Sequence, residues 1–145
     1  MACVIRGPGG VLIRAPHLAK YDRDIVQQFL DDNVHTPCQI LFDVPLPPIV
    51  EPKKQVIKTP AGQWKALKAK RIDMVIVRPT CVYVCEAKPG ASAMAVGQVL
   101  MYQELYHQYY LPTVPVIMLI LTDRLDPDVQ MVCAKKRILY YETQT

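Results

Sequence analysis

The sequence predicts an α/β protein with a mixed central β-sheet flanked by helices. Two segments rich in Val and Ile, Arg71–Val77 and Cys81–Lys88, are separated by three residues, which predicts a β-hairpin. A helix-forming segment, Ala91–Tyr110, and an apolar strand, Val114–Leu121, follow the hairpin. Strand, helix and strand in this order predict a βαβ unit with a right-handed crossover. A chain of 145 residues is expected to form a single domain over residues 1–145.

The other expected elements follow from periodicity and from capping residues. Apolar residues recur at i, i+4 and i+8 within Lys20–Asp32, which predicts an amphipathic helix. Ser92 and Asp126 are the expected helix N-caps, and Asp126 has a proline directly after it. The remaining expected elements are strands at Gln39–Val44 (ending before Pro45), Gln55–Lys58 (before a turn at Thr59–Gly62) and Ile138–Glu142, and a helix at Pro127–Lys136.

Composition and cysteine usage exclude several classes of protein. Apolar residues make up 51% of the chain and charged residues 21%, a balance that supports a folded core. The longest apolar run, Val114–Leu121, is far shorter than the about 18 residues that span a bilayer, and no signal-peptide pattern opens the chain, so no membrane partner is expected. Five cysteines without a CxxC or a Cys/His cluster argue against a disulfide framework, a zinc site and an iron–sulfur site. We therefore expect an intracellular, cytoplasmic protein, or one that acts in the host cell if a virus encodes it.

Positive charge is concentrated in one stretch of an otherwise slightly acidic chain. Between positions 51 and 71, seven basic residues accompany one acid, so this stretch carries +6, whereas the whole chain carries +4 and the remainder −2. The basic residues are Lys53, Lys54, Lys58, Lys65, Lys68, Lys70 and Arg71. Such a stretch indicates a polyanionic partner, although a solvated loop whose lysines aid solubility has the same pattern.

Three charged residues interrupt one apolar face of the predicted hairpin. A four-residue loop would pair Val77 with Val82. Counting back along both strands, Asp73 then lies directly opposite Glu86, and Lys88 leaves the same strand face as Glu86. Two facing carboxylates, with Cβ atoms about 4.5–5.5 Å apart, repel each other unless a cation lies between them. The pattern predicts a site for a hard divalent ion, Mg²⁺ or Mn²⁺, and an ion-pair network that involves Lys88 is the alternative.

Gln98 and Tyr102 are four residues apart in the predicted helix and share one of its faces. In a βαβ unit this helix returns across the sheet, beside the strand that carries Glu86 and Lys88. A surface glutamine and a partly buried tyrosine would have the same spacing.

These motifs resemble the PD-(D/E)xK nuclease superfamily. The matching elements are Asp73 in RIDMVIV, Glu86, Ala87 and Lys88 in VCEAKP, and Gln98 and Tyr102 in GQVLMYQELY. The Gln-xxx-Tyr element is similar to that of the RecB-like branch. The resemblance covers about residues 20–122 and is specific over 71–102. The chain departs from the family pattern at Ile72, where proline is common, and it lacks the cysteine quartet that holds an iron–sulfur cluster in some RecB-like relatives.

The first predicted helix resembles that of archaeal Holliday-junction resolvases in its segment Tyr-Asp-Arg-Asp-Ile-Val. This resemblance implies that Asp22 supplies a further metal-binding acid, with Asp24 as the second choice. His17 is a third candidate, because some RecB-like enzymes use a histidine near this point. A solvated acid in the first turn, favoured by the helix dipole, would have the same sequence pattern.

The superfamily resemblance implies a restriction-endonuclease-like core and a metal-dependent nuclease that hydrolyses phosphodiester bonds, with DNA favoured as the substrate. The implied metal ligands are Asp73, Glu86, the Ala87 carbonyl and Asp22, and the implied catalytic residues are Asp73, Glu86, Lys88, Gln98 and Tyr102. The basic stretch from Lys53 to Arg71 would bind the nucleic acid. An inactive nucleic-acid-binding or interaction module of the same fold is the alternative. Endo- or exonuclease action, DNA or RNA, strandedness and homodimer formation are left open.

Overall fold

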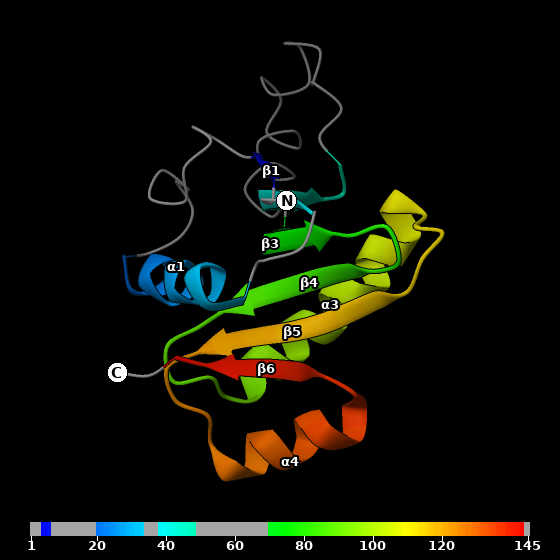
Figure 1. Cartoon of the computed structure of the whole chain (residues 1–145). Helices are drawn as coiled ribbons and strands as arrows, with labels where there is room; N and C mark the ends of the chain where they lie inside the picture. Colours follow the sequence, from blue (N-terminus) through cyan, green and yellow to red (C-terminus); the bar gives the residue numbers. More distant parts are fainter. Residues whose placement is uncertain (1–3, 7–19, 34–37, 49–69, 144–145) are drawn as a thin grey trace, which may run out of the picture.

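The computed structural model describes residues 4–6, 20–33, 38–48 and 70–143, which form a six-stranded sheet with helices on both faces (Figure 1). The strands are β1 (Val4–Arg6), β2 (Gln39–Leu46), β3 (Lys70–Val77), β4 (Val82–Ala87), β5 (Val116–Thr122) and β6 (Leu139–Glu142). The helices are α1 (Lys20–Asn33), α3 (Ala93–Tyr110) and α4 (Pro127–Lys136). The α/β class with a mixed sheet is therefore confirmed.

The strands lie in the sheet in chain order, from β1 to β6. Strands β2, β3 and β4 form an antiparallel meander, whereas β5 and β6 run parallel to their preceding neighbours and are reached through α3 and α4. The predicted hairpin register is confirmed, because Val77 pairs with Val82. Strand β1, which pairs with the start of β2, was not predicted, because three residues are too few to establish an alternating pattern.

Most predicted elements are confirmed within one or two residues of their expected ends. Ser92 caps α3 and accepts a hydrogen bond from the Met94 N–H, and Asp126 caps α4 in the same way. Strand β2 was expected to stop before Pro45 but continues to Leu46. Because β1 pairs only with the first residues of β2, Pro45 lies where β2 is an edge strand, and a missing N–H is tolerated there. The strand and turn expected at residues 55–62 lie outside the described residues.

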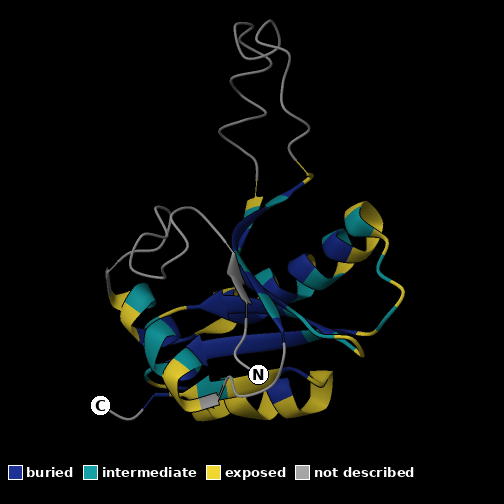
Figure 2. Cartoon of the chain, turned by 45° about the horizontal axis from the view of Figure 1, so that its top comes forward, coloured by how far each residue is buried: buried dark blue, intermediate teal, exposed yellow. Residues whose placement is uncertain are grey.

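Two apolar clusters cover the two faces of the sheet, and the strands between them are largely buried (Figure 2). One cluster packs under α1 and the other under α3. Phe42 and Val44 are two residues apart, yet Phe42 belongs to the α1 cluster and Val44 to the α3 cluster. Met74 and Ile72 divide in the same way, although strict alternation along β3 would place both on one face. The residue between the two members of each pair, Asp43 in β2 and Asp73 in β3, is where the alternation of side chains between the two faces breaks. The break in β2 is described below.

The cysteines depart in one respect from the sequence expectation. Cys38 is disulfide-bonded, whereas Cys81, Cys85 and Cys133 are free thiols. Within the described ranges, none of the helices combines the length and the apolar character that crossing a membrane requires.

Candidate active site

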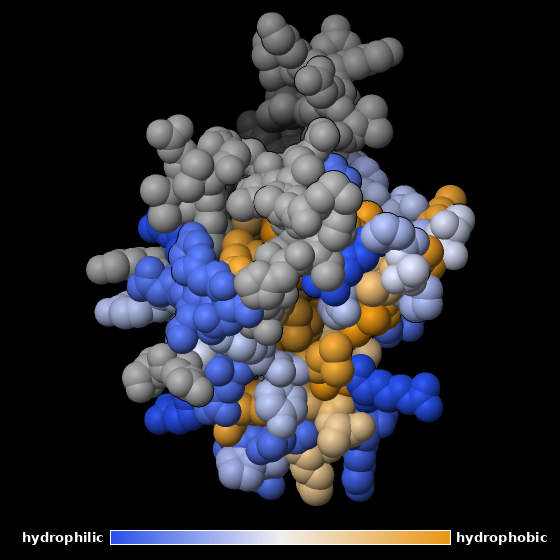
Figure 3. Space-filling view, viewed as in Figure 1, coloured by the Kyte–Doolittle hydropathy of each residue, from blue (hydrophilic) through white to orange (hydrophobic). Residues whose placement is uncertain are grey.

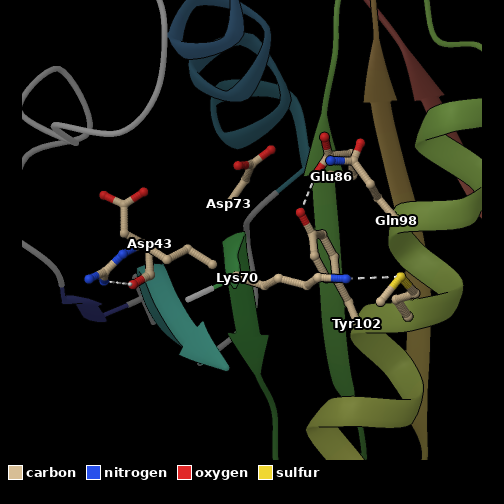
Figure 4. Close-up of a pocket in the computed structure, with 8 residues that line it drawn as sticks. Asp43, Lys70, Asp73, Glu86, Gln98 and Tyr102 are labelled. Carbon is tan, nitrogen blue, oxygen red and sulfur yellow. Dashed lines mark hydrogen bonds between the residues drawn. The ribbon is translucent and has the colours of Figure 1, made fainter. Parts of the chain in front are cut away.

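A cleft of about 340 Å³ opens between the sheet and α3, where β3 begins and β4 ends (Figure 4). Its lining residues are Asp43, Lys70, Arg71, Asp73, Glu86, Gln98, Met101 and Tyr102. Six of these eight residues, namely Lys70, Arg71, Asp73, Glu86, Gln98 and Tyr102, were predicted as site residues from sequence. Strands β2, β3 and β4 and helix α3 thus each contribute side chains to one cleft.

The two central carboxyl groups, those of Asp73 and Glu86, lie side by side. The paired positions of β3 and β4 end at Met74 and Cys85, so Asp73 and Glu86 occupy the next positions of the two strands. The strand pairing does not extend to these positions. Oδ2 of Asp73 instead accepts a hydrogen bond of 2.9 Å from the backbone N–H of Ala87. The two carboxyl groups lie close enough for the charge of Glu86 to raise the pKa of Asp73. The structure therefore brings together the two acids that the hairpin register aligns.

Burial raises the pKa of both acids. Desolvation, followed by the negative charge of Glu86, raises the pKa of Asp73 from 3.8 to about 8. Desolvation also raises the pKa of Glu86, although the hydrogen bond from Tyr102, the interaction with Asp73 and the positive charge of Lys88 oppose that rise. Without a cation, the pair therefore holds a proton at neutral pH.

The acid of the first helix that lies near this pair is Asp22. Its negative charge raises the pKa of both Asp73 and Glu86. Asp22 is half-buried, whereas Asp24 is exposed to solvent. Of the two acids considered on α1, the structure thus brings Asp22 to the site, and His17 lies outside the described residues.

Helix α3 supplies three side chains to the cleft, those of Gln98, Met101 and Tyr102. The Tyr102 hydroxyl donates a hydrogen bond of 2.8 Å to Oε2 of Glu86, and Tyr102 is 95% buried, with an exposed fraction of 5%. Desolvation and the nearby Glu86 raise the pKa of Tyr102, which keeps its hydroxyl a hydrogen-bond donor. Gln98 lies one turn earlier and lines the cleft on the same side as Glu86 and Tyr102 (Figure 4).

Lys88 differs from the other predicted catalytic residues in its position. It follows the last residue of β4, its side chain is exposed, and it does not line the cleft. Its charge still lowers the pKa of Glu86. Within the described part of the chain, no direct hydrogen bond joins Lys88 to Gln98, because the side chain of Lys88 extends into solvent beyond the strand end.

Asp43 on β2 is a cleft residue that the sequence reasoning missed. Its neighbours Phe42 and Val44 pair with Met74 and Ile72, so Asp43 and Asp73 occupy facing positions between those pairs. Asp43 is 6% exposed and has a left-handed backbone with a φ of 53°. That backbone conformation breaks the alternation of β2. The signal was present in the sequence, because Asp43 is the one charged residue in the strand QILFDVPL.

Three acids, Asp43, Asp73 and Glu86, therefore occupy one row across three adjacent strands. Two basic side chains, those of Lys70 and Arg71, flank this row of acids. Nη1 of Arg71 donates a hydrogen bond of 3.3 Å to the backbone oxygen of Asp43, and Nζ of Lys70 donates one of 3.2 Å to Sδ of Met101. The other basic residues predicted to bind nucleic acid, Lys53, Lys54, Lys58, Lys65 and Lys68, lie outside the described residues.

The oxygen-rich donor set suits a hard divalent cation better than a soft metal. In the described ranges, no group of three His, Cys, Asp or Glu side chains has a metal-binding arrangement. A Mg²⁺ site requires no such group, since Mg²⁺ commonly binds one or two carboxylates together with water and substrate phosphate.

Comparison of the chain with protein-family models, curated proteins and solved structures returned no match. The functional argument therefore depends on the geometry of the cleft.

Proposed function

We propose that this protein is a divalent-metal-dependent nuclease with a PD-(D/E)xK core that hydrolyses phosphodiester bonds. DNA is the favoured substrate. The observation that carries the proposal is the buried pair of carboxyl groups, Asp73 and Glu86, in a cleft that also contains Gln98 and Tyr102. The element order supports it, because a helix, an antiparallel three-stranded meander, a second helix and a parallel strand follow one another in α1 to β5.

The residues present fit a hard cation. Two adjacent buried carboxylates repel when both are ionised, and a divalent ion removes this repulsion. The N–H of Ala87 points toward Asp73, and in an extended strand the carbonyl of the same residue leaves on the same strand edge. We therefore assign Asp73, Glu86 and the Ala87 carbonyl as ligands, with Asp22 as the further acid.

The other side chains have distinct roles in this proposal. A bound Mg²⁺ or Mn²⁺ would polarise the scissile phosphate and lower the pKa of a water molecule. Tyr102 fixes the carboxylate of Glu86 through its hydroxyl. Gln98 orients the groups that react, and Lys88 offsets negative charge that develops on the phosphate. Lys70 and Arg71 bind the phosphates of the strand that enters the cleft.

A nucleic-acid-binding module that does not cut is the second candidate. It would share the fold and the basic stretch. A buried acid pair without a catalytic cation lowers stability at neutral pH, so a protein that only binds has little reason to keep it. The structure is compatible with both endo- and exonuclease action.

The test is cleavage of labelled linear, circular and branched DNA in Mg²⁺, in Mn²⁺ and in excess EDTA. We expect cleavage with either metal and none in EDTA. Degradation of circular DNA would identify an endonuclease, and degradation of linear DNA alone an exonuclease. Full activity in EDTA would overturn the metal mechanism.

Two variants distinguish a nuclease from the binding module. Asp73→Asn and Glu86→Gln should abolish cleavage while the protein stays folded and binds DNA. Mn²⁺ should raise the melting temperature of the wild type and leave that of Asp73→Asn unchanged, because metal binding stabilises only the state that holds the metal. A wild type that binds DNA without cutting it and without any response to Mn²⁺ would favour the binding module.

A further inference from the structure

We propose that two copies of this protein pair through strand β6, with their β6 strands antiparallel across a two-fold axis, and so form one continuous twelve-stranded sheet. Strand β6 is the last strand of the sheet. Its residues are exposed along most of its length, and Leu139 and Tyr140 are 49% and 38% exposed. Edge strands that remain unpaired usually carry charged side chains, proline or a covering segment. Apolar side chains on an open edge favour pairing with another strand.

Among the described residues, no strand pairs with the outer edge of β6, so its outward-facing backbone groups can bind a further strand there. The Thr143 N–H donates to the Thr122 carbonyl, so residue 143 and alternate residues before it face β5. Tyr140 and Glu142 therefore direct their N–H and C=O groups away from β5, toward the outside of the sheet. These groups are the ones that a further strand would bind.

The alternation of inward-facing and outward-facing residues along β6 restricts the register in which two copies can pair. In an antiparallel pair, residues that face outward must lie opposite residues that face outward. Centring the axis on Tyr140 meets this condition and sets Leu139 opposite Tyr141 of the second copy. Centring it on Tyr141 also meets it, but sets Glu142 opposite Tyr140 and Leu139 opposite Thr143. The Tyr140 register is favoured, because it pairs apolar and aromatic side chains.

The charges along β6 are complementary to those of a second, antiparallel copy. Lys135, Lys136 and Arg137 precede the strand, and Glu142 ends it. In the Tyr140 register, Glu142 lies opposite Ile138 of the second copy, one position from its Arg137. The two-fold axis repeats this approach of opposite charges at the other end of the interface. A second copy of the chain is therefore the occupant that this edge fits.

A groove beside the strand provides space for the second copy. It has a volume of about 350 Å³ on the α1 face, and Leu139, Tyr141 and Phe29 are among its lining residues. Figure 3 shows apolar surface over this part of the sheet, which α1 does not cover. In the Tyr140 register, Tyr141 of the second copy lies opposite Leu139, at the rim of the groove.

The register can be tested by a cysteine on the proposed axis. Facing residues of a hydrogen-bonded antiparallel pair have Cα atoms about 5.5 Å apart, within the range that a disulfide bridges. Oxidation should therefore convert Tyr140→Cys to a covalent dimer. The wild type, which keeps its own thiols, and Leu111→Cys, with a cysteine at a position that is 76% exposed, should stay monomeric on non-reducing gels. Equal cross-linking of the two variants, or efficient cross-linking of Tyr141→Cys in place of Tyr140→Cys, would overturn the proposal.

A second measurement tests association without cross-linking. In sedimentation velocity the dimer fraction of the wild type should rise with concentration. Tyr140→Lys sets two like charges across the axis and should weaken self-association about tenfold or more, with an unchanged melting temperature. Tyr109→Lys, a substitution at a similarly exposed tyrosine on α3, should associate like the wild type. A wild type that stays monomeric at the highest concentration, or a Tyr140→Lys variant that still dimerises, would contradict the proposal. The dimer does not depend on the proposed nuclease activity.

Discussion

At the scale of single residues, the acid pair of Asp73 and Glu86 is the most informative feature of the molecule. Burial keeps both carboxyl groups away from water, and the charge of Glu86 raises the pKa of Asp73 further. The proton that Asp73 holds in the fold therefore couples folding to pH. In the proposed nuclease the same proton would have to leave for a cation to bind, which would couple metal binding to pH.

This coupling predicts how the stability of the metal-free protein depends on pH. The pKa of Asp73 is 3.8 in its ordinary state and about 8 in the fold, so between these values the folded state binds more protons than the unfolded state. The free energy of unfolding should therefore be highest near pH 4 and fall as the pH rises toward 8, by at least about 1.4 kcal/mol, the value of one pKa unit.

Urea denaturation in EDTA from pH 4 to pH 8 measures this dependence. Asp73→Asn should flatten it and make the protein more stable than the wild type at pH 8, because the variant removes the proton-binding acid. Asp24→Asn alters an exposed acid of α1 and serves as the matched control, with wild-type behaviour. A wild type whose stability rises steadily over this range would show that the two acids are ionised and satisfied in another way.

Tyr102 is the second residue with a measurable role. Tyr102→Phe removes the hydroxyl that donates to Glu86 within the buried cleft, and should reduce the free energy of unfolding by about 1–3 kcal/mol. Tyr109→Phe, at a 39% exposed position of the same helix, should leave it unchanged. Urea denaturation at pH 7 compares the two variants, and equal stabilities would mean that the Tyr102 hydroxyl contributes nothing to the fold.

At the scale of elements, helix α3 packs against the sheet and places the side chains of Gln98 and Tyr102 in the cleft. Ser92 sets the start of the helix, and from that point the spacing of about 3.6 residues per turn brings Gln98 and Tyr102 to one face. Buried Ala95 and Val99 fix the rotation of the helix against the sheet. Gln98 can therefore reach the cleft only because the apolar side chains of its own helix orient it.

A substitution of Gln98 can distinguish a role in DNA binding from a role in catalysis. Gln98→Ala should slow metal-dependent cleavage about tenfold or more and change DNA affinity less than about threefold, because its proposed function is to orient the reacting groups. Single-turnover cleavage and a binding titration in Ca²⁺ measure the two quantities. Gln108→Ala, on an exposed turn of α3, is the control. An equal loss of affinity and rate would instead make Gln98 a substrate-binding residue.

At the scale of the whole molecule, charge is distributed unevenly between the sheet and the basic stretch. Lys70 and Arg71, at the end of that stretch, line the cleft, so the cleft and the stretch are continuous along the chain. A nucleic acid that contacts Lys70 and Arg71 would therefore lie beside Asp73 and Glu86.

Salt dependence measures this whole-molecule property. Neutralising Lys65, Lys68 and Lys70 together should weaken DNA binding and reduce the slope of log affinity against log salt by up to about three units, roughly one for each phosphate contact. Neutralising Lys135, Lys136 and Arg137 at the C-terminal end of α4 should leave the slope unchanged. The reverse result would locate the nucleic acid at α4.

Local patterns of residues were enough to predict the elements and the register of the hairpin. Val and Ile runs marked β3 to β5, capping residues marked the starts of α3 and α4, and the loop length aligned Asp73 with Glu86. These features depend on neighbours in the chain, so that a pattern of residues is sufficient to predict them.

Only the tertiary structure decided which distant residues share the cleft. It brought Asp43 into the row of acids, selected Asp22 over Asp24, and left Lys88 exposed at the rim. Each of these outcomes depends on a left-handed residue in β2, on how α1 packs against the sheet, or on where β4 ends. Such features arise from packing between elements that are far apart in the chain, and no local pattern encodes them.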